Sequence, residues 1–338
     1  MRAHRPLSLA LVLLCAPASA TAAPPQPLAD VQVIPLPRVT RRIDHLAVDP
    51  ASKRLFVAAL GNGTLEVLDV GAGTRITSVR GLNEPQGVAY VAQQHRVVVA
   101  MRGGSVAAFD DSTWQRVGTI PDVRDADNLR WDASAGQLYV GYGEGTGTGT
   151  GTGTGALGVI DPPSMKIVAS IAVGAHPESF RLEESGPRVF VNVPDLHEIV
   201  VVDRKTRAIV MHVPLPGFAD NYPMYLDERG HRLFVGVRQP AELLVFDTTT
   251  GRRIAHVPSA GDADDLFYDA KRDRVYVVGG EGFVDVFDAA SARYDRLAHI
   301  PTRKGARTGI WSSELDRLFV AWPARDGKDA EIHAYAPP

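Results

Sequence analysis

The sequence has a single cysteine, no net positive charge and no long apolar segment after its first residues. Each of these absences excludes a class of protein. Cys15 is the only cysteine in 338 residues. The chain can therefore form no internal disulfide, no metal site built from several thiolates and no c-type haem attachment. After the first 22 residues no apolar run is long enough to cross a bilayer, so no membrane span is predicted. The sequence also contains no Gly-x-Ser-x-Gly nucleophile elbow and no His-x-x-x-His pair.

Residues 1–22 have the three parts of a signal peptide. A short basic start is followed by the apolar run Leu7–Cys15 and then by small residues, and small-x-small cleavage patterns lie at 18–20 and 20–22. The alternative of a lipoprotein anchored at the cysteine needs a small residue where Leu14 stands. We expect the leader to be cleaved and the mature chain to be periplasmic or secreted.

The charge balance argues against nucleic acid as a partner. The 36 Lys and Arg residues face 39 Asp and Glu residues, which gives a net charge of −3. Removing residues 1–22 takes away two arginines and no acidic residue, so the mature chain 23–338 carries −5. A nucleic-acid binder needs a basic surface to displace counterions from phosphates, and no basic stripe is present here.

One pattern recurs along the mature chain: a short apolar strand ending in an acid, a turn, an apolar triplet, a second turn, and apolar-x-apolar-Asp. The first strand of the copies ends at Asp49, Val91, Asp132, Glu183, Asp227, Asp269 and Ser312. Successive ends are 42, 41, 51, 44, 42 and 43 residues apart. A period near 42 with several short strands per unit is typical of propeller blades. The sequence therefore predicts a single all-β domain, a seven-bladed β-propeller with four-stranded antiparallel blades, with approximate blade bounds 43–82, 83–122, 123–174, 175–217, 218–260, 261–302 and 303–338.

Two features depart from the regular repeat. The long step of 51 residues contains alternating Gly and Thr at 145–155, which we expect to form a surface loop between two strands of the third blade. The last blade has only three strands of its own. The extended segment 28–38, which includes Val31–Ile34, is predicted to supply the missing outer strand and so to close the ring.

The repeat unit resembles that of the YVTN-repeat, YncE-like propellers. Their unit reads roughly Tyr-Val-Thr-Asn, a gap, Val-x-Val-Ile-Asp, a turn and an apolar strand, and it is matched here by Val189–Asn192, Ile199–Asp203 and the pair at 209–210. The resemblance covers essentially the whole mature chain and implies this fold in an exported protein. The family shares no catalytic motif, and related propellers include lactonases, dehydrogenase subunits and binding scaffolds, so fold alone does not choose a function.

Acidic and amide side chains gather in the segments that enter the first strand of each blade. The row nearest the strand consists of Asp44, Gln86, Asp127, Glu178, Tyr222, Asp264 and Arg307. The row two residues earlier consists of Arg42, Glu84, Asp125, His176, Asp220, Asp262 and Gly305. Beside the first row are His45, Asn128, Asn221 and Asp265. Because these segments meet at one end of the channel, the sequence predicts an acidic channel mouth as the candidate ligand-binding site.

Two interpretations of this mouth remain open. Carboxylate and amide oxygens suit Ca²⁺ or Mg²⁺, and the predicted ligands are Asp44, Asn128, Glu178, Asn221 and Asp264. Exported six-bladed lactonases use a similar Glu/Asn/Asp calcium set, although the motif order here differs. The alternative is a water-filled channel in which the acids cap turns and Arg307 balances their charge.

The sequence predicts a monomer that acts as a binding scaffold for a small molecule, a cation or a peptide at the channel mouth. The alternative is a divalent-metal-dependent hydrolase of lactonase type, in which His45 or His176 acts as a general base. Neither activity nor cofactor follows from the sequence. The tryptophans at 114, 131, 311 and 322 occupy different points of the repeat and are interpreted as blade packing.

Overall fold

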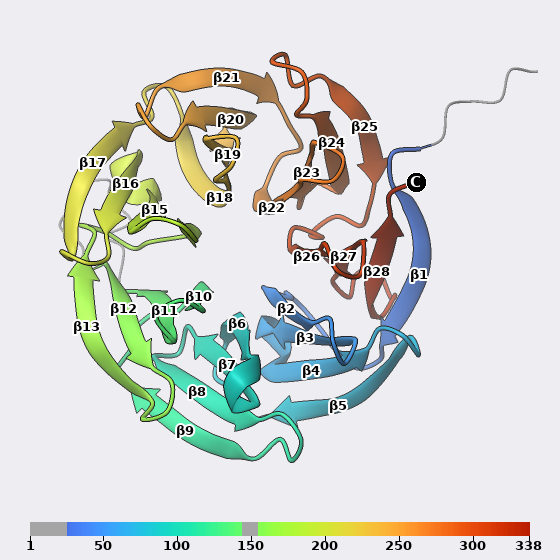
Figure 1. The fold of residues 1–338 in the computed structure, drawn as a ribbon. Coiled ribbons are helices and arrows are strands. Elements are labelled where there is room, and N and C mark those ends of the chain that lie inside the picture. The colour runs from blue at the N-terminus through green and yellow to red at the C-terminus, as the bar shows by residue number, and fades with distance from the viewer. Residues whose placement is uncertain (1–25, 144–154) are drawn as a thin grey trace, which may run out of the picture.

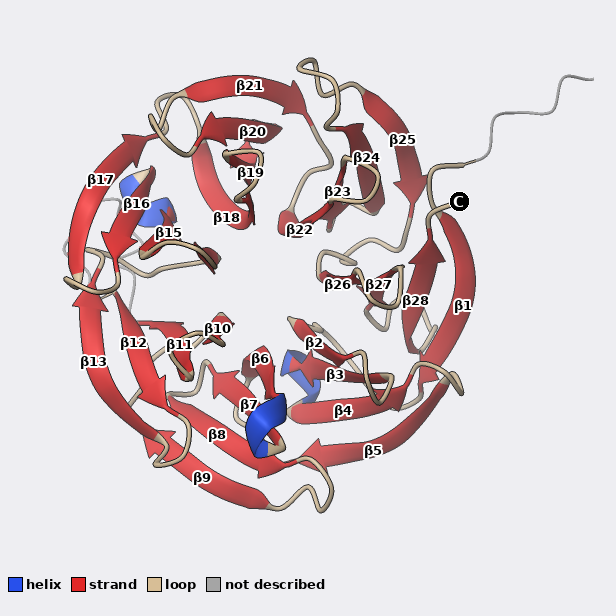
Figure 2. Cartoon of the chain, viewed as in Figure 1, coloured by secondary structure: helices blue, strands red, loops and turns tan. Residues whose placement is uncertain are grey.

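The computed structural model describes residues 26–143 and 155–338. The signal peptide predicted at 1–22, and all of the Gly-Thr insert except Gly155, lie outside the described residues. Seven four-stranded antiparallel sheets are arranged in a ring around a central axis, as Figures 1 and 2 show. The predicted all-β propeller of seven four-stranded blades is confirmed.

In the first six blades, the four strands follow one another in sequence order from the innermost strand to the outermost. The first blade consists of β2 (Leu46–Asp49), β3 (Arg54–Ala59), β4 (Thr64–Asp69) and β5 (Thr74–Arg80). The second consists of β6 (Pro85–Val91), β7 (Arg96–Met101), β8 (Ser105–Asp110) and β9 (Arg116–Pro121). The third consists of β10 (Leu129–Asp132), β11 (Gln137–Tyr142), β12 (Ala156–Asp161) and β13 (Lys166–Ala172). The fourth consists of β14 (Phe180–Leu182), β15 (Arg188–Val193), β16 (Glu198–Asp203) and β17 (Ala208–Pro214).

The remaining blades follow the same order, except that the last one combines the two ends of the described chain. The fifth consists of β18 (Ala219–Asp227), β19 (Arg232–Gln239), β20 (Ala241–Asp247) and β21 (Arg253–Pro258). The sixth consists of β22 (Ala263–Asp269), β23 (Arg274–Gly279), β24 (Phe283–Asp288) and β25 (Arg296–Pro301). The seventh consists of β26 (Gly309–Ser312), β27 (Arg317–Trp322), β28 (Ala330–Ala336) and β1 (Ala29–Leu36).

The helices of the described residues are single 3-10 turns at Leu60–Asn62, Ala92–Gln94 and Pro194–Leu196. None of them has the length and apolar character needed to cross a membrane.

The apolar triplets of the repeat form the second strand of each blade. Leu55, Phe56 and Val57 in β3 are fully buried, as are Val97, Val98 and Val99 in β7. Alternating side chains point to opposite faces of a sheet, so a continuous buried run means that both faces of the strand are covered. Neighbouring blades provide that cover. The outermost strands, by contrast, alternate between exposed and partly buried residues because only one face packs inwards.

The aspartate that ends the third strand of most blades shapes the turn that follows. In β4, Asp69 Oδ1 accepts hydrogen bonds from the backbone N–H groups of Gly71 and Ala72, both at 2.8 Å. Asp203 makes the same pair of contacts after β16. The repeated Asp of the sequence pattern is therefore a turn residue and not a channel residue.

The N-terminal strand closes the ring. β1 pairs antiparallel with β28, and its register joins Ala29 to Ala336 and Leu36 to Ala330. Ile34 and Leu36 point inwards and are fully buried in the core between the seventh and first blades. The predicted closing strand is confirmed, and Figure 1 shows it as the outermost strand beside the C-terminus.

We expect Ile34→Ala to lower the free energy of unfolding by about 2–4 kcal/mol, because it removes buried methyl groups at the closure and leaves a cavity. Val33→Ala on the same strand is the matched control, since Val33 is 45% exposed and its truncation should change stability by about 0.5 kcal/mol or less. Chemical denaturation of both variants measures the difference. Equal stability of the two variants would contradict a role for β1 in closing the ring.

Candidate functional site

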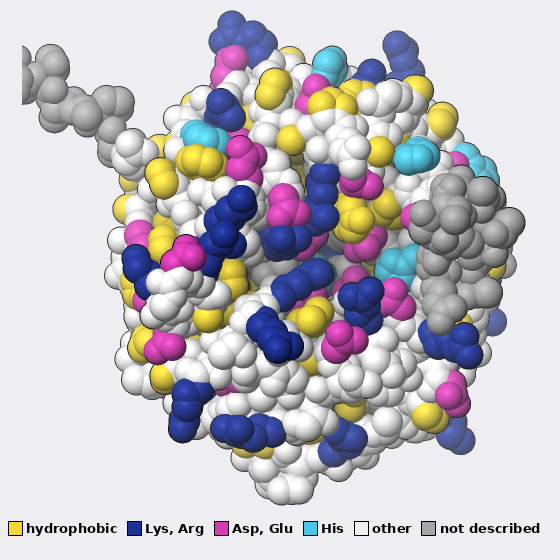
Figure 3. Space-filling model, turned by 180° about the vertical axis from the view of Figure 1, so that it is seen from behind, with side chains coloured by type: hydrophobic (Ala, Val, Ile, Leu, Met, Phe, Trp, Pro, Cys, Tyr) yellow, Lys and Arg dark blue, Asp and Glu magenta, His cyan; other side chains and the backbone are white. Residues whose placement is uncertain are grey.

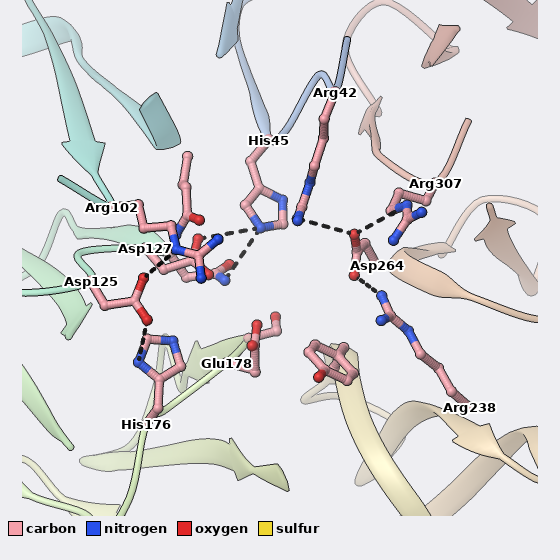
Figure 4. A pocket seen from close by; sticks show the side chains of 14 residues that line it. Arg42, His45, Arg102, Asp125, Asp127, His176, Glu178, Arg238, Asp264 and Arg307 are labelled. Atoms are coloured by element: carbon pink, nitrogen blue, oxygen red, sulfur yellow. Dashed lines mark hydrogen bonds and ion pairs between the residues drawn. The ribbon is translucent and has the colours of Figure 1, made fainter. Parts of the chain in front are cut away.

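The channel opens at one end into a cavity of about 230 Å³. Its walls come from the segments that precede the innermost strands, from the first parts of β6, β18 and β22, and from the ends of the second strands. Figure 4 shows these side chains converging from different blades, and Figure 3 shows charged side chains of both signs around a hollow at the centre of one face. The predicted site residues that line this mouth cavity are His45, Asp125, Asp127, Asn128, His176, Glu178, Tyr222, Asp264 and Arg307.

Two predicted residues flank the mouth cavity without lining it. Asp44 is buried, 1% exposed, and its Oδ2 lies 3.0 Å from Nη2 of Arg42. Asp262 lies further out, with its carboxylate oxygens 2.7 Å from Arg307 and 3.5 Å from Arg238. Both carboxylates are therefore neutralised by arginines.

Three other predicted residues are not part of the mouth cavity. Asn221 is fully buried and its amide donates to Asn192 Oδ1 and to the carbonyl of Glu198, both at 3.0 Å. Glu84 is exposed outside the cavity. Asp265 lies below it, towards the middle of the channel. The register of the repeat placed these residues near the mouth, but the direction of each side chain depends on the local turn.

The sequence interpretation missed two arginines and a serine of the mouth cavity, Arg102, Arg238 and Ser179. Each arginine stands three residues after the last residue of an apolar triplet, Val99 or Val235. The ends of the second strands therefore face the mouth as well. Repeat alignment at this position could have identified both arginines.

Asp264 is the centre of an arginine cluster. Arg238 Nη2 forms a short contact with Asp264 Oδ1, while Oδ2 lies 3.5 Å from Arg42 and 3.8 Å from Arg307. The Arg238 guanidinium also stacks 4.0 Å from the centre of the Tyr222 ring. With three guanidinium groups around it, Asp264 is a poor metal ligand, because a divalent cation would meet positive charge on every side.

On the opposite side of the mouth cavity, His176 is held by a backbone carbonyl. Its Nδ1 lies 2.5 Å from the carbonyl oxygen of Gly143 and 3.8 Å from Asp125, which also pairs with Arg102. A hydrogen bond from Nδ1–H to a carbonyl leaves Nε2 as the free acceptor of the neutral ring. This is the arrangement that orients histidine ligands in metal sites.

Asp127 and Glu178 lie between these two groups, and among the described residues neither carboxyl accepts a hydrogen bond, although Asp127 Oδ1 lies 3.7 Å from Nε2 of His45. Asp127 is 8% exposed, and its buried Oδ1 accepts no hydrogen bond. Among the described residues the Glu178 carboxyl forms no hydrogen bond or ion pair, and no dashed line reaches it in Figure 4. Burial and the charge of Glu178 raise the pKa of Asp127 to about 7, while burial and Asp264 raise the pKa of Glu178 to about 8.

His45 forms a polar layer across the channel. Its Nδ1 lies 3.3 Å from Asp265 Oδ2, and its Nε2 lies 3.7 Å from oxygens of Asp44 and Asp127. Burial opposes the charged imidazole, but the negative charges of Asp265, Asp44 and Asp127 outweigh it and raise the pKa of His45 to about 10. At neutral pH His45 is therefore a fixed cation and a poor general base.

One group of acidic and histidine residues in the described part of the chain could hold a metal ion. It consists of Asp127, His176 and Glu178, whose ligand atoms lie within 4.8 Å of one another. Of the five predicted Ca²⁺ or Mg²⁺ ligands, only Glu178 belongs to this group. Asn221 is bonded within the blades, Asp44 and Asp264 face arginines, and Asn128 Oδ1 accepts a hydrogen bond from Arg130. One imidazole with two carboxylates favours Zn²⁺ or Mn²⁺ over an all-oxygen Ca²⁺ site.

Comparison with known proteins identifies the fold. A chain in the crystal structure of the mitotic checkpoint complex superimposes with a TM-score of 0.76 and 12% identity, over 97% of this chain and 98% of that chain. Identity this low is evidence for the fold alone. The sequence matches no family model and no curated protein. The chain is thus a seven-bladed β-propeller, a fold that commonly serves as a protein-binding scaffold.

The two raised carboxyl pKa values predict a pH dependence. The folded chain holds protons on Asp127 and Glu178 that the unfolded chain releases near pH 4, so the free energy of unfolding falls as the pH rises from about 4 to about 8. His45 acts in the same direction, because its stabilising contribution is present below about pH 6.5 and is lost as the pH rises through about 10.

We expect Glu178→Gln to be more stable than the unsubstituted protein above pH 8 by an amount on the order of 1–2 kcal/mol, and equally stable near pH 4. The control is Glu84→Gln, on an exposed side chain outside the cavity. Denaturation in the presence of a chelator at several pH values measures the effect. Parallel stability curves for the unsubstituted protein and Glu178→Gln would contradict the raised pKa of Glu178.

Proposed function

We propose that the protein is a binding scaffold whose mouth cavity takes a small molecule with one cationic and one anionic group. The observation that carries this proposal is the unpartnered Glu178 carboxyl beside the buried, unbonded Oδ1 of Asp127. Buried polar groups are normally hydrogen-bonded, so the buried Oδ1 of Asp127, with the partly buried Glu178 carboxyl beside it, is suited to a donor from outside the chain.

An ammonium or guanidinium group of the ligand supplies that donor. Its positive charge favours ionisation of Asp127 and Glu178, so binding at neutral pH releases protons. Arg102, Arg238 and Arg307 at the rim would hold a carboxylate at the other end of the same ligand. A cavity of about 230 Å³ suits an amino acid or the end of a peptide rather than a larger cofactor.

We also propose the family and the cellular location of the protein. The leader and the repeat resemblance favour an exported YVTN-repeat, YncE-like propeller in the periplasm or medium. We further propose that it works as a monomer and that nucleic acid is not its partner, in keeping with its net negative charge.

Calorimetric titration with free arginine, lysine and glutamate tests the proposal. We expect arginine or lysine to bind more tightly at pH 8 than at pH 6, because fewer protons must then be released, and glutamate to bind at least about tenfold more weakly. Glu178→Gln should abolish binding while Glu84→Gln keeps it. Glutamate binding as tightly as lysine, or full binding by Glu178→Gln, would overturn the assignment.

The cluster of Asp127, His176 and Glu178 favours a second candidate, a divalent-metal-dependent hydrolase of lactonase type. A metal held there would polarise a carbonyl or activate a water molecule. We expect Zn²⁺ or Mn²⁺ to raise the melting temperature of chelator-treated protein and His176→Gln to remove the rise, since a ligand that binds only the folded state stabilises it. A panel of lactones and esters then tests activity. No rise with any divalent metal would exclude this candidate.

A further inference from the structure

A second cavity, of about 290 Å³, lies along the innermost strands beyond the His45 layer. His45 and Asn128 line both cavities, so their side chains form the partition between them. We call this second space the lower cavity. Its walls include the side chains of Arg130, Trp131, Arg181, Tyr225 and Trp311.

Two arginines of the lower cavity lack an acidic partner. Arg130 donates to the carbonyl of Leu129 at 2.8 Å, to Asn128 Oδ1 at 2.9 Å and to Ser179 Oγ at 3.2 Å, but its buried Nε has no hydrogen-bond partner. Arg181 uses its Nε to donate to the carbonyl of Met224 at 3.0 Å. Within the described part of the chain neither guanidinium belongs to an ion pair.

The one carboxylate that lines the lower cavity is already engaged. Asp265 Oδ2 accepts from the backbone N–H of Gly309 at 3.0 Å and lies 3.3 Å from the charged His45 ring. Burial and mutual repulsion lower the pKa of Arg130, and burial lowers the pKa of Arg181. Both shifts mean that the two positive charges cost free energy where they are, and an anion between them would relieve that cost.

Aromatic residues form part of the remaining wall. The Arg181 guanidinium lies 4.6 Å from the centre of the Tyr225 ring. Trp131 in β10 and Trp311 in β26 lie on innermost strands and also face the lower cavity. Both tryptophans also pack against the cores of the blades, as predicted, and the Trp311 ring lies 5.3 Å from that of Tyr276. Flat apolar surfaces beside guanidinium groups suit a planar anion.

We propose that the lower cavity is a binding site for a small aromatic carboxylate, with the carboxylate held by Arg130 and Arg181 and the ring against the aromatic wall. A carboxylate can accept two parallel hydrogen bonds from a guanidinium, which a single chloride ion cannot. The site is separate from the mouth cavity and does not depend on the function proposed there.

Benzoate is the probe, followed by thermal melting and by quenching of tryptophan fluorescence. We expect benzoate to raise the melting temperature and to quench emission, since two of the four tryptophans line the site. Arg181→Gln and Arg130→Gln should each weaken binding by at least about tenfold. Arg293→Gln, on an exposed arginine that lines neither cavity, is the control and should leave benzoate binding unchanged. If Arg130→Gln fails to fold, Arg181→Gln still tests the site, because the Arg181 side chain makes one hydrogen bond within the described part of the chain, to the carbonyl of Met224.

Two further probes test the arginines and the aromatic wall separately. Uncharged benzamide keeps the ring without the carboxylate, and inorganic phosphate keeps the negative charge without the ring. Weaker binding of both than of benzoate supports the proposal. Benzamide binding as tightly as benzoate would overturn the role of the arginines, and phosphate binding as tightly would overturn the role of the aromatic wall. No effect of benzoate at millimolar concentration, or full binding by both arginine variants, would overturn the site itself.

Discussion

Closure of the ring by β1 and β28 is the constraint on which the rest of the structure depends. Each blade has two apolar faces, and every face needs a neighbouring blade to cover it. The closing strand supplies the last cover and leads, within a few residues, into the segment that carries Arg42, Asp44 and His45. The same contact that completes the core therefore also holds one wall of the channel in place.

The seven blades bring polar residues of both charges into one narrow channel. Asp127 and Glu178, whose carboxyls accept no hydrogen bond from the described residues, line the mouth cavity, while Arg130 and Arg181, which have no acidic partner there, line the lower cavity. The cationic His45 lies between the two cavities and forms ion pairs with Asp127 on the mouth side and with Asp265 on the other side. A propeller can tolerate such electrostatically unfavourable side chains because its stability comes from the packing of the blades and not from the channel.

These groups favour binding over catalysis as the primary role. His45 is held in its charged form by three carboxylates and is therefore a poor general base, whereas the carbonyl that holds Nδ1 of His176 leaves its Nε2 free. The catalytic alternative relies on a metal at Asp127, His176 and Glu178, whose ligand atoms lie close enough to hold one. Binding requires only a complementary ligand, and both cavities contain unpartnered groups that such a ligand would satisfy.

The sequence by itself determined the blades, because strand identity depends on local side-chain periodicity that a 42-residue repeat displays seven times. It also determined which segments meet at the mouth, since repeat register sets the end of the channel at which each residue lies. The tertiary structure decided how the side chains pair: Asn221 turns into the blades, Arg238 neutralises Asp264, and Arg130 and Arg181 are left without acids. These pairings join residues from different blades, so they depend on the closed ring and on individual rotamers. No local sequence pattern records either of them.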